Sequence, residues 1–578
     1  MHFKSMTAEM AAEENTNGSL RFGIMCNGWA LQVWQVKAIQ ILTEKGSEPV
    51  LLIFNDVPQE PVKVWNQLVH YPYKNLLYRL FLRFCHHPAS KKTVDMQDAF
   101  HHIPLIKCCP AKIKHSEYFS ESDVAFIKDQ HLDFILRFGF NIIRGKILNA
   151  ARYGVWSFHH GDEQQFRGGP PGFWEIYRER PVTGAILQRL TDRLDAGIVL
   201  RKGYFKTIRH SWSGSVDELF METARWPAQV ATDLKNNVNL SWEDDPSTTT
   251  APIYKNPGNL QMIGFVLRLT ASRLRFHWNS MTKAEKWNIG LIKTPLQNFL
   301  EYPSKETPTW LLSPRSHQYA ADPFVMPDQN CLRIFYESYD YRTGKGNIST
   351  IKFDPVNGRV APPTIALERE YHMAYPFLFE SDGKWYCVPE SAQNHTIDLY
   401  LWDVATEKIV FIKTLIHDID AVDSTVFKHD AYWWLFCTYK SLSDTHLFVW
   451  YSDELSGPYT PHHNNPVKTD VRSARPAGPP FTVNGSLMRP AQDCSHVYGG
   501  RINIQKIVRL TPSEFEETQL QTIEPFYGTA FPKGIHTMLG AGKYTVIDAK
   551  KYVFDRWNFI RQLKMKINRR ILQKPDPI

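Results

Sequence analysis

Three side chains in the N-terminal half have the types and the order needed to transfer an acyl group. His159 ends a short apolar run, Arg167 and Gly168 follow in a loop rich in glycine and proline, and Asp195 comes later in the sequence LDAG. Acyl transfer to an amine passes through a tetrahedral oxyanion, which needs a hydrogen-bond donor, and the amine needs a base for its proton. An imidazole beside a carboxylate can do either job, because the carboxylate raises the pKa of the ring. His159 and Asp195 are therefore candidate catalytic residues.

Alternating strands and helices must position these side chains. Apolar runs at 21–28, 49–56, 133–143 and 155–160 are separated by helical patterns. This order predicts an open, mostly parallel α/β sheet. Ligands bind such sheets at the carboxyl ends of the strands, and His159 lies at one of these ends. No GxGxxG or GxxxxGKS sequence follows the first strand, so nucleotide binding of those types is not indicated.

The segment 154–200 resembles the catalytic segment of the formyltransferase family, which includes methionyl-tRNA, glycinamide ribonucleotide and nucleotide-sugar formyltransferases. The family pattern is a strand ending in Asn-x-His, a loop with Arg-Gly, a Thr-Gly strand and Leu-Asp-x-Gly. The resemblance implies catalysis by His159 and Asp195, with Ser157 at the position of the family's asparagine. It also implies a formyltransferase-like fold and 10-formyltetrahydrofolate as the donor.

Two further groups of residues follow from the same resemblance. The folate would be bound by Leu136, Phe138, Gly139, Phe140 and Asp192. The amine substrate would be bound by His160, Asp162, Arg167, Gly168, Gly169 and Gln188. His160 and Asp162 could also supply the donor that the asparagine supplies in the family. Two alternatives stay open at this site, which are a different transfer or hydrolysis and a fold without activity.

The C-terminal half repeats itself about every 50 residues, which predicts a domain of the propeller type. Three repeats begin with ADPF, AYPF and VDST, whose second residues are Asp322, Tyr375 and Asp423. Weaker fourth and fifth repeats contain Arg489 and His536. Five repeats of about four strands each predict an all-β, five-bladed propeller.

The repeat starts resemble the five-bladed propellers of furanosidase-type glycoside hydrolases. They resemble more closely the propeller at the N-terminus of glucosamine inositolphosphorylceramide transferases. Blade starts in such folds point into an axial funnel, which implies a set of funnel residues: Asp322, Glu390, Asp423, Arg489 and Gln492. Three roles stay open for this set, namely hydrolysis by an acid of raised pKa opposite a base, binding of a glycan or sugar nucleotide, and closure of the blades.

The chain is too long for one hydrophobic core, so we expect several regions. These are a disordered N-terminus (1–20), a formyltransferase-like domain (21–237), a linker with a basic helix (238–286), a propeller (287–550) and a basic amphipathic tail (551–578). A helix docked on the protein and a weak contact with a membrane surface both remain open for the tail.

Composition excludes several classes of protein. A formal charge of +8 over 578 residues is too small to indicate nucleic-acid binding. The eight cysteines form no CxxC pair, so neither a metal site nor a disulfide framework is expected. No leader sequence and no run of about 18 apolar residues is visible, which predicts a cytoplasmic protein.

The two halves together predict N-formylation of an amino sugar, free or linked to a nucleotide, in glycan biosynthesis. The alternative is a glycosidase or glycosyl transferase that acts through the propeller, with the N-terminal domain as a scaffold. In a third interpretation both halves are binding modules of an assembly complex.

Overall fold

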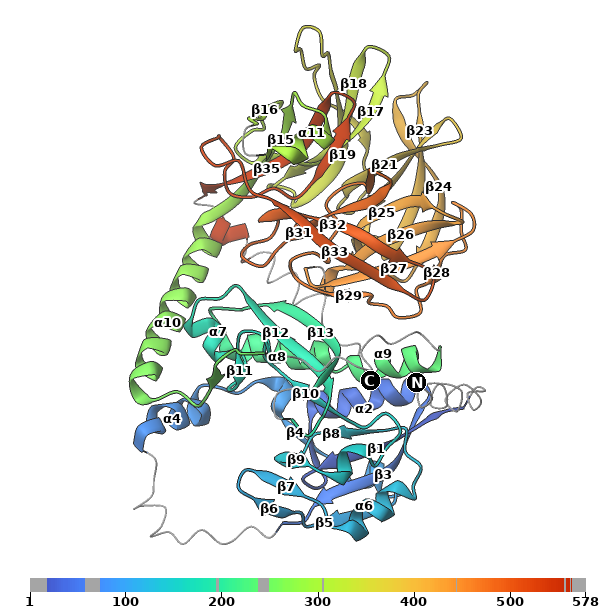
Figure 1. The fold of residues 1–578 in the computed structure, drawn as a ribbon. Coiled ribbons are helices and arrows are strands. Elements are labelled where there is room, and N and C mark those ends of the chain that lie inside the picture. Colours follow the sequence, from blue (N-terminus) through green and yellow to red (C-terminus); the bar gives the residue numbers. More distant parts are fainter. Residues whose placement is uncertain are drawn as a thin grey trace, which may run out of the picture. The chain divides into compact units, whose positions relative to one another are not determined.

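The computed structural model describes residues 18–57, 73–193, 197–236, 249–303, 306–442, 444–555, 558–561 and 563. The chain divides into two compact units, Met1–Ser272 and Arg273–Ile578, and the division falls within the long helix α10 (Asn259–Thr282). Figure 1 labels many of the elements of each unit. Asp195, most of the predicted disordered N-terminus and most of the predicted tail lie outside the described residues.

An open seven-stranded sheet forms the framework of the N-terminal unit, in the order β13-β12-β10-β8-β1-β3-β5. The strands from β10 to β5 run parallel, whereas β12 and β13 are antiparallel to their neighbours. The bounds are β1 (Leu20–Cys26), β3 (Ser47–Asn55), β5 (Leu105–Cys108), β8 (Phe134–Arg137), β10 (Val155–His159), β12 (Val182–Arg189) and β13 (Ile198–Lys206).

Both faces of this sheet are buried, because successive side chains of a strand point to opposite faces. Phe22 and Ile24 of β1 join the core on one face, and Met25 joins the core on the other. Helices α2, α8 and α9 cover the first face and α6 covers the second (Figure 1). The helices are α2 (Val33–Glu44), α4 (Leu76–Phe84), α5 (Gln97–Phe100), α6 (Glu121–Lys128), α7 (Phe173–Tyr177), α8 (Trp212–Thr223) and α9 (Trp226–Lys235).

Short strands pair outside the large sheet. They are β2 (Ala30–Gln32) with β4 (Thr93–Asp95), β7 (Ser116–Tyr118) with both β6 (Ala111–Ile113) and β9 (Ile142–Arg144), and β11 (Arg167–Gly168) with β14 (Ile253–Tyr254).

Five antiparallel sheets make up the C-terminal unit. The first holds β17 (Gln318–Asp328), β18 (Cys331–Asp340), β19 (Lys345–Phe353) and β20 (Thr364–Leu367). The second holds β21 (Ala374–Ser381), β22 (Lys384–Glu390), β23 (Thr396–Asp403) and β24 (Lys408–His417). The third holds β25 (Ala421–His429), β26 (Tyr432–Tyr439), β27 (His446–Ser452), β28 (Thr460–Pro461) and β29 (Lys468–Thr469). The fourth holds β30 (Phe481–Val483), β31 (Ser486–Asp493), β32 (Arg501–Leu510) and β33 (Phe515–Ile523).

The fifth sheet joins the two ends of this unit. Its strands are β34 (Met538–Ala541), β35 (Tyr544–Phe554), β15 (Lys283–Ile292) and β16 (Thr309–Trp310), and α11 (Leu296–Glu301) follows β15. Strand β15 pairs with β35 over its full length, from Lys283 opposite Phe554 to Ile292 opposite Thr545. The sheet is therefore complete only when both ends of the unit are in place.

Neighbouring sheets share hydrophobic cores. One core runs through the fifth, first, second and third sheets. Trp434 and Ile507 share a core that joins the third sheet to the fourth, and Ile504 and Ile547 share one that joins the fourth to the fifth. The five sheets thus close into a ring, and the prediction of a propeller-like all-β half is confirmed.

Two elements begin earlier than the predicted boundaries. Strand β1 begins at Leu20, and β15 begins at Lys283 inside the segment predicted as a linker. Helix α10 occupies much of that segment. Within the described residues, no helix combines the length and the apolarity needed to cross a membrane.

Candidate functional site

Five buried side chains, each in or just before the innermost strand of one blade of the C-terminal unit, meet at the centre of the ring. They are Asp322, Tyr375, Asp423, Arg475 and His536, and we call them the central residues. The Tyr375 hydroxyl accepts a hydrogen bond from the backbone N–H of Gly478 at 2.9 Å. This bond joins the second sheet to the fourth, and sheets that are not neighbours in the ring can meet only near its axis.

A shared backbone distortion aims three of the central residues. Asp322, Tyr375 and Asp423 adopt left-handed φ angles of 52°, 40° and 52°. Strand pairing shifts register at the same three places, where a bulge re-aims the side chain. Such a conformation costs a non-glycine residue about 1–3 kcal/mol and is typical of functional sites. Its occurrence at three equivalent positions indicates that the fold is built to direct these side chains inward.

Arg475, rather than Arg489, is the central residue of the fourth sheet. The fourth repeat begins Ala474-Arg475-Pro476, like the earlier AYPF start, but only an isolated bridge from Pro476 to Ala491 remains of the inner strand. The prediction therefore placed the start one strand too late. Arg489 is ion-paired with Glu517 at 2.6 Å and donates to the Ser473 carbonyl.

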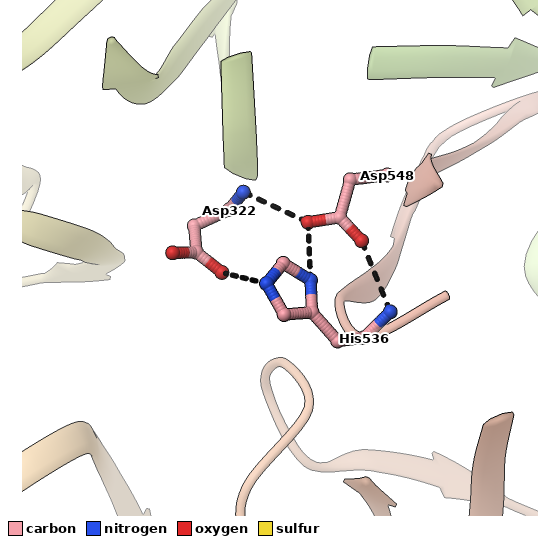
Figure 2. Close-up of side chains that lie close together, drawn as sticks. All are labelled: Asp322, His536 and Asp548. Atoms are coloured by element: carbon pink, nitrogen blue, oxygen red, sulfur yellow. Dashed lines mark hydrogen bonds and ion pairs between the residues drawn. The ribbon is translucent and has the colours of Figure 1, made fainter. Parts of the chain in front are cut away.

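His536 lies between two carboxylates (Figure 2). Its Nδ1 is 2.6 Å from Asp548 Oδ2, and its Nε2 is 3.5 Å from Asp322 Oδ1. Burial alone would lower the pKa of His536, but the charges of Asp548 and Asp322 raise it above its usual value. The ligand atoms of the three residues lie within 4.8 Å of one another, which is close enough to share a metal ion. Because a carboxylate already faces each ring nitrogen, we interpret the group as a charged histidine between two anions.

Asp423 is held as a fixed anion on the other side of the site. Its Oδ2 accepts hydrogen bonds from Arg475 Nε at 2.5 Å and from Gln492 Nε2 at 2.9 Å. Gln492 also donates to the Pro476 carbonyl at 2.8 Å, which fixes the amide. The structure thus brings the predicted residues Asp423 and Gln492 together.

Two buried glutamates complete the site. Burial and then the charge of Asp423 raise the pKa of Glu390 to about 8, and burial raises the pKa of Glu337 well above its usual value. Burial also raises the pKa of Asp322 to about 6. Glu337 was not predicted, although it follows Asp322 by 15 residues, as Glu390 follows Tyr375. Comparison of the repeats at this spacing could have found it.

The predicted catalytic residues of the N-terminal unit are only partly described. Ser157 is buried in β10, and its hydroxyl accepts a hydrogen bond from Arg137 Nη1 at 2.8 Å. The same guanidinium donates to the carbonyls of Phe140 and Asn141. His159 ends β10, while Asp195 lies outside the described residues, so their pairing stays a prediction.

The segment predicted to bind folate packs tightly on β1. Leu136 is fully buried in the core, and Phe138 packs edge-on against Trp34. The N–H groups of Phe138 and Gly139 both donate to the Met25 carbonyl, at 2.8 and 3.0 Å. The N–H of Phe140 donates to the Asn27 side chain. Asp192 accepts a hydrogen bond from the Gly145 N–H. These internal bonds use the backbone N–H groups of Phe138, Gly139 and Phe140, and folate binding by this segment stays a prediction.

The residues predicted to bind the amine substrate also make internal contacts. His160 stacks on Phe220 with ring centroids 3.6 Å apart, and burial lowers its pKa well below the usual value. Asp162 accepts hydrogen bonds from the two glutamines that follow it. The Arg167 side chain donates a hydrogen bond to the Ala251 carbonyl. Gly168 pairs with Tyr254 between two short strands, and the Gly169 N–H donates to the Tyr254 carbonyl. Gln188 lies opposite Ser157 in the large sheet.

Comparison with known proteins places the clearest similarity in the C-terminal unit. Residues 312–559 match the family model described as glucosamine inositolphosphorylceramide transferase 1, N-terminal. The glucosamine inositolphosphorylceramide transferase 1 of Arabidopsis thaliana is 31% identical over 239 residues, which are 39% of this chain and 30% of that protein. The predicted resemblance to these transferases is therefore confirmed. The chain spans about a third of the length of the transferases that it matches.

Similarity to formyltransferases is weaker. The methionyl-tRNA formyltransferase of Geobacillus thermodenitrificans is 31% identical over 107 residues, which cover 18% of this chain and 32% of that protein. Among solved structures, an exo-beta-1,3-galactanase from Clostridium thermocellum shares 13% identity over 36% of this chain and 53% of that chain. Its TM-score is 0.31, and we draw no inference from it.

The prediction of folate-dependent formyl transfer is wrong. The family match and the transferase relatives lie in the propeller-like unit, so they favour the alternative that acts through it. The geometry agrees with this correction, because Ser157 and the Phe138–Phe140 backbone make internal bonds in the N-terminal unit. Several carboxyl groups with raised pKa values, among them Glu337 and Glu390, lie close together at the centre of the C-terminal unit.

Proposed function

We propose that this protein makes or breaks glycosidic bonds of an amino-sugar glycan at the central residues and the adjacent Glu390, with the N-terminal unit as a scaffold. The observation that carries the proposal is a neutral acid beside a fixed anion. Glu390, with a pKa of about 8, is protonated at pH 7, and Asp423 is held by Arg475 and Gln492. Glycosidic bond chemistry needs an acid that protonates the bridging oxygen and a carboxylate that supports positive charge on the sugar ring.

The chemical roles follow from these environments. Glu390 gives its proton to the glycosidic oxygen, and its pKa matches this role because burial disfavours the carboxylate. Asp423 faces the developing charge of the sugar. Asp322, with its partner His536, is a second anion in the same site. The name of the transferase relatives, glucosamine inositolphosphorylceramide transferase 1, supports glucosamine as the sugar and a phosphate-bearing acceptor as the second substrate.

The leaving group of the substrate tests the role of Glu390. We expect Glu390→Gln to lower kcat for a methyl glucosaminide by roughly 100- to 10,000-fold, because protonation of this poor leaving group is lost. The same variant should lose far less activity on a 2,4-dinitrophenyl glucosaminide, whose leaving group needs no proton. Equal losses on both substrates would show that Glu390 is structural.

The pH profile gives an independent test. The protonated form of Glu390 exists below a pH of about 8 and is lost above it. The kcat/KM for the methyl glucosaminide should therefore fall as the pH rises through about 8, and Glu390→Gln should remove this limb. If neither hydrolysis nor transfer of any glucosaminide can be detected for the full chain, the proposal fails.

A further inference from the structure

An open cavity lies in the N-terminal unit, between the segment 78–92 and the start of helix α8. Its volume is about 590 Å³, which is within the range of sites that hold small organic molecules. None of its lining residues belongs to the sets predicted to bind folate or the amine substrate. The apolar part of the lining is formed by Tyr78, Leu82, Pro170, Pro171, Trp212 and Val216.

Uncharged aromatic rings form one wall of the cavity. The His86 ring stacks on the Trp212 ring with centroids 3.7 Å apart. Burial and the charge of Lys91 lower the pKa of His86 to about 4, so this imidazole is neutral at pH 7. The Trp212 indole N–H donates to the Pro171 carbonyl at 2.8 Å, and His86 Nδ1 lies 3.2 Å from the Ser213 hydroxyl. Because these polar atoms have partners within the protein, the wall offers a ligand mainly apolar contact.

Lys91 brings a positive charge to this apolar cavity. It ends the one-turn 3-10 helix Ala89–Lys91, and its Nζ lies 4.6 Å from the centre of the Phe220 ring. The carboxylate of Asp217 accepts a hydrogen bond from the Ser90 N–H at 2.7 Å. Burial lowers the pKa of Lys91, and no acid among the described residues offsets this shift. Lys91 therefore has an aromatic neighbour but no anionic partner in the part of the chain that the structure describes.

We propose that this cavity binds an aromatic carboxylate, whose ring packs against Trp212 and whose carboxylate pairs with Lys91. The rings and prolines of the lining select a flat apolar ligand rather than a sugar, whose hydroxyl groups need many hydrogen-bond partners. A carboxylate supplies the counter-charge that Lys91 lacks, and such a charge-assisted hydrogen bond is stronger than a neutral one. Lys92, which is exposed and also lines the cavity, adds a second positive charge. The inference does not depend on the proposed glycosidic chemistry, because all of these residues belong to the N-terminal unit.

Isothermal titration calorimetry of the full chain with 2-naphthoate tests this site. The comparison ligand is 2-naphthylmethanol, which has the same rings but no charge. We expect saturable binding of 2-naphthoate that is at least about tenfold tighter than binding of the alcohol, because a hydrogen bond to a charged group is gained. Lys91→Met removes the charge and keeps an apolar side chain. It should weaken 2-naphthoate binding by at least about tenfold and leave the affinity for the alcohol unchanged.

Further variants separate the site from general effects. Lys112→Met is the matched control, because Lys112 is exposed on β6 outside the cavity, and it should bind both ligands like the unmodified protein. Lys91→Arg keeps the charge and should retain most of the affinity for 2-naphthoate. Leu82→Trp narrows the cavity and should weaken the binding of both ligands. Thermal unfolding of each variant checks that it is folded.

The outcomes of these titrations decide the proposal. It is overturned if 2-naphthoate does not bind the unmodified chain, or binds no more tightly than the alcohol. It is also overturned if the folded Lys91→Met variant binds 2-naphthoate as tightly as the unmodified chain does. Binding that is unchanged in Leu82→Trp would place the ligand elsewhere on the chain and would contradict this site as well.

Discussion

The two units differ in how their candidate chemistry is encoded and in what the fold does with it. In the N-terminal unit the predicted residues form a contiguous motif, yet Ser157 bonds to Arg137 and His160 stacks on Phe220. In the C-terminal unit the central residues are spread from Asp322 to His536, and several acids there have raised pKa values. A sequence motif can be inherited without the activity of its family. Reactive sites instead contain ionisable groups whose pKa values are shifted by burial and by neighbouring charges.

The largest expected effect contrasts Glu390 with His159. Glu390→Gln should lower glucosaminide turnover by roughly 100- to 10,000-fold, because a general acid is lost. His159→Ala should change turnover by less than about threefold, since we propose that the N-terminal unit is a scaffold. Steady-state kinetics of the two variants measure this contrast. If His159→Ala has the larger effect, the roles of the two units are reversed.

Removing Arg475 should destabilise the C-terminal unit more than any surface change. Arg475→Ala leaves Asp423 buried without its cation, and breaking such a pair costs about 3–5 kcal/mol. Urea unfolding followed by tryptophan fluorescence should show the loss. Arg342→Ala is the matched control, because Arg342 also pairs with an aspartate, Asp340, but its own side chain is 63% exposed, so little change is expected. Equal urea midpoints for the two variants would show that the buried Arg475–Asp423 pair contributes no more to stability than the exposed pair.

The stability of the two units should depend on pH over different ranges. Glu390 has a folded pKa of about 8 and Glu175 of the N-terminal unit one of about 7, both raised chiefly by burial from 4.5. Each folded unit thus binds a proton that the unfolded chain has lost, so this contribution to stability is full below pH 4.5 and lost as the pH rises to the folded pKa.

Substitution by glutamine separates these two contributions. Glu175→Gln should remove a pH dependence that ends near 7, and Glu390→Gln one that continues to about 8. Urea unfolding at intervals between pH 5 and pH 8.5 measures both. Identical slopes for the unmodified chain and Glu390→Gln would show that this carboxyl does not stay neutral in the folded unit.

The smallest expected effect tests why the predicted folate segment contains a glycine. A Cβ on Gly139 would lie 2.7 Å from the Cys26 carbonyl carbon, so Gly139→Ala should destabilise the N-terminal unit by about 1–3 kcal/mol. Gly258→Ala would meet its neighbours at 3.7 Å and should cost much less. Thermal unfolding compares the two. If both substitutions lower the stability equally, the close approach of Gly139 to β1 does not explain why this position is a glycine.

The sequence allowed the regular features of both units to be predicted. Strands β1, β3 and β10 followed from apolar runs, and Asp322 and Asp423 followed from the spacing of the repeats. Arg475 was missed because its inner strand is interrupted, which removes the apolar run that marks the other blades. The bond from Arg137 to Ser157 joins neighbouring strands through a long side chain, and periodicity does not predict such a contact.

Asp548 lies on β35, and this has a consequence for synthesis. A ribosome makes β15 at residues 283–292 long before β35 at 544–554, although the two strands pair in one sheet. Throughout that interval β15 has an unpaired edge that other chains can join. Asp548, whose carboxylate contacts His536, lies on this last strand. The nascent chain therefore brings all the central residues into their final contacts only when the ring of sheets closes. A chaperone that covers this edge during synthesis would therefore raise the yield of folded, active protein.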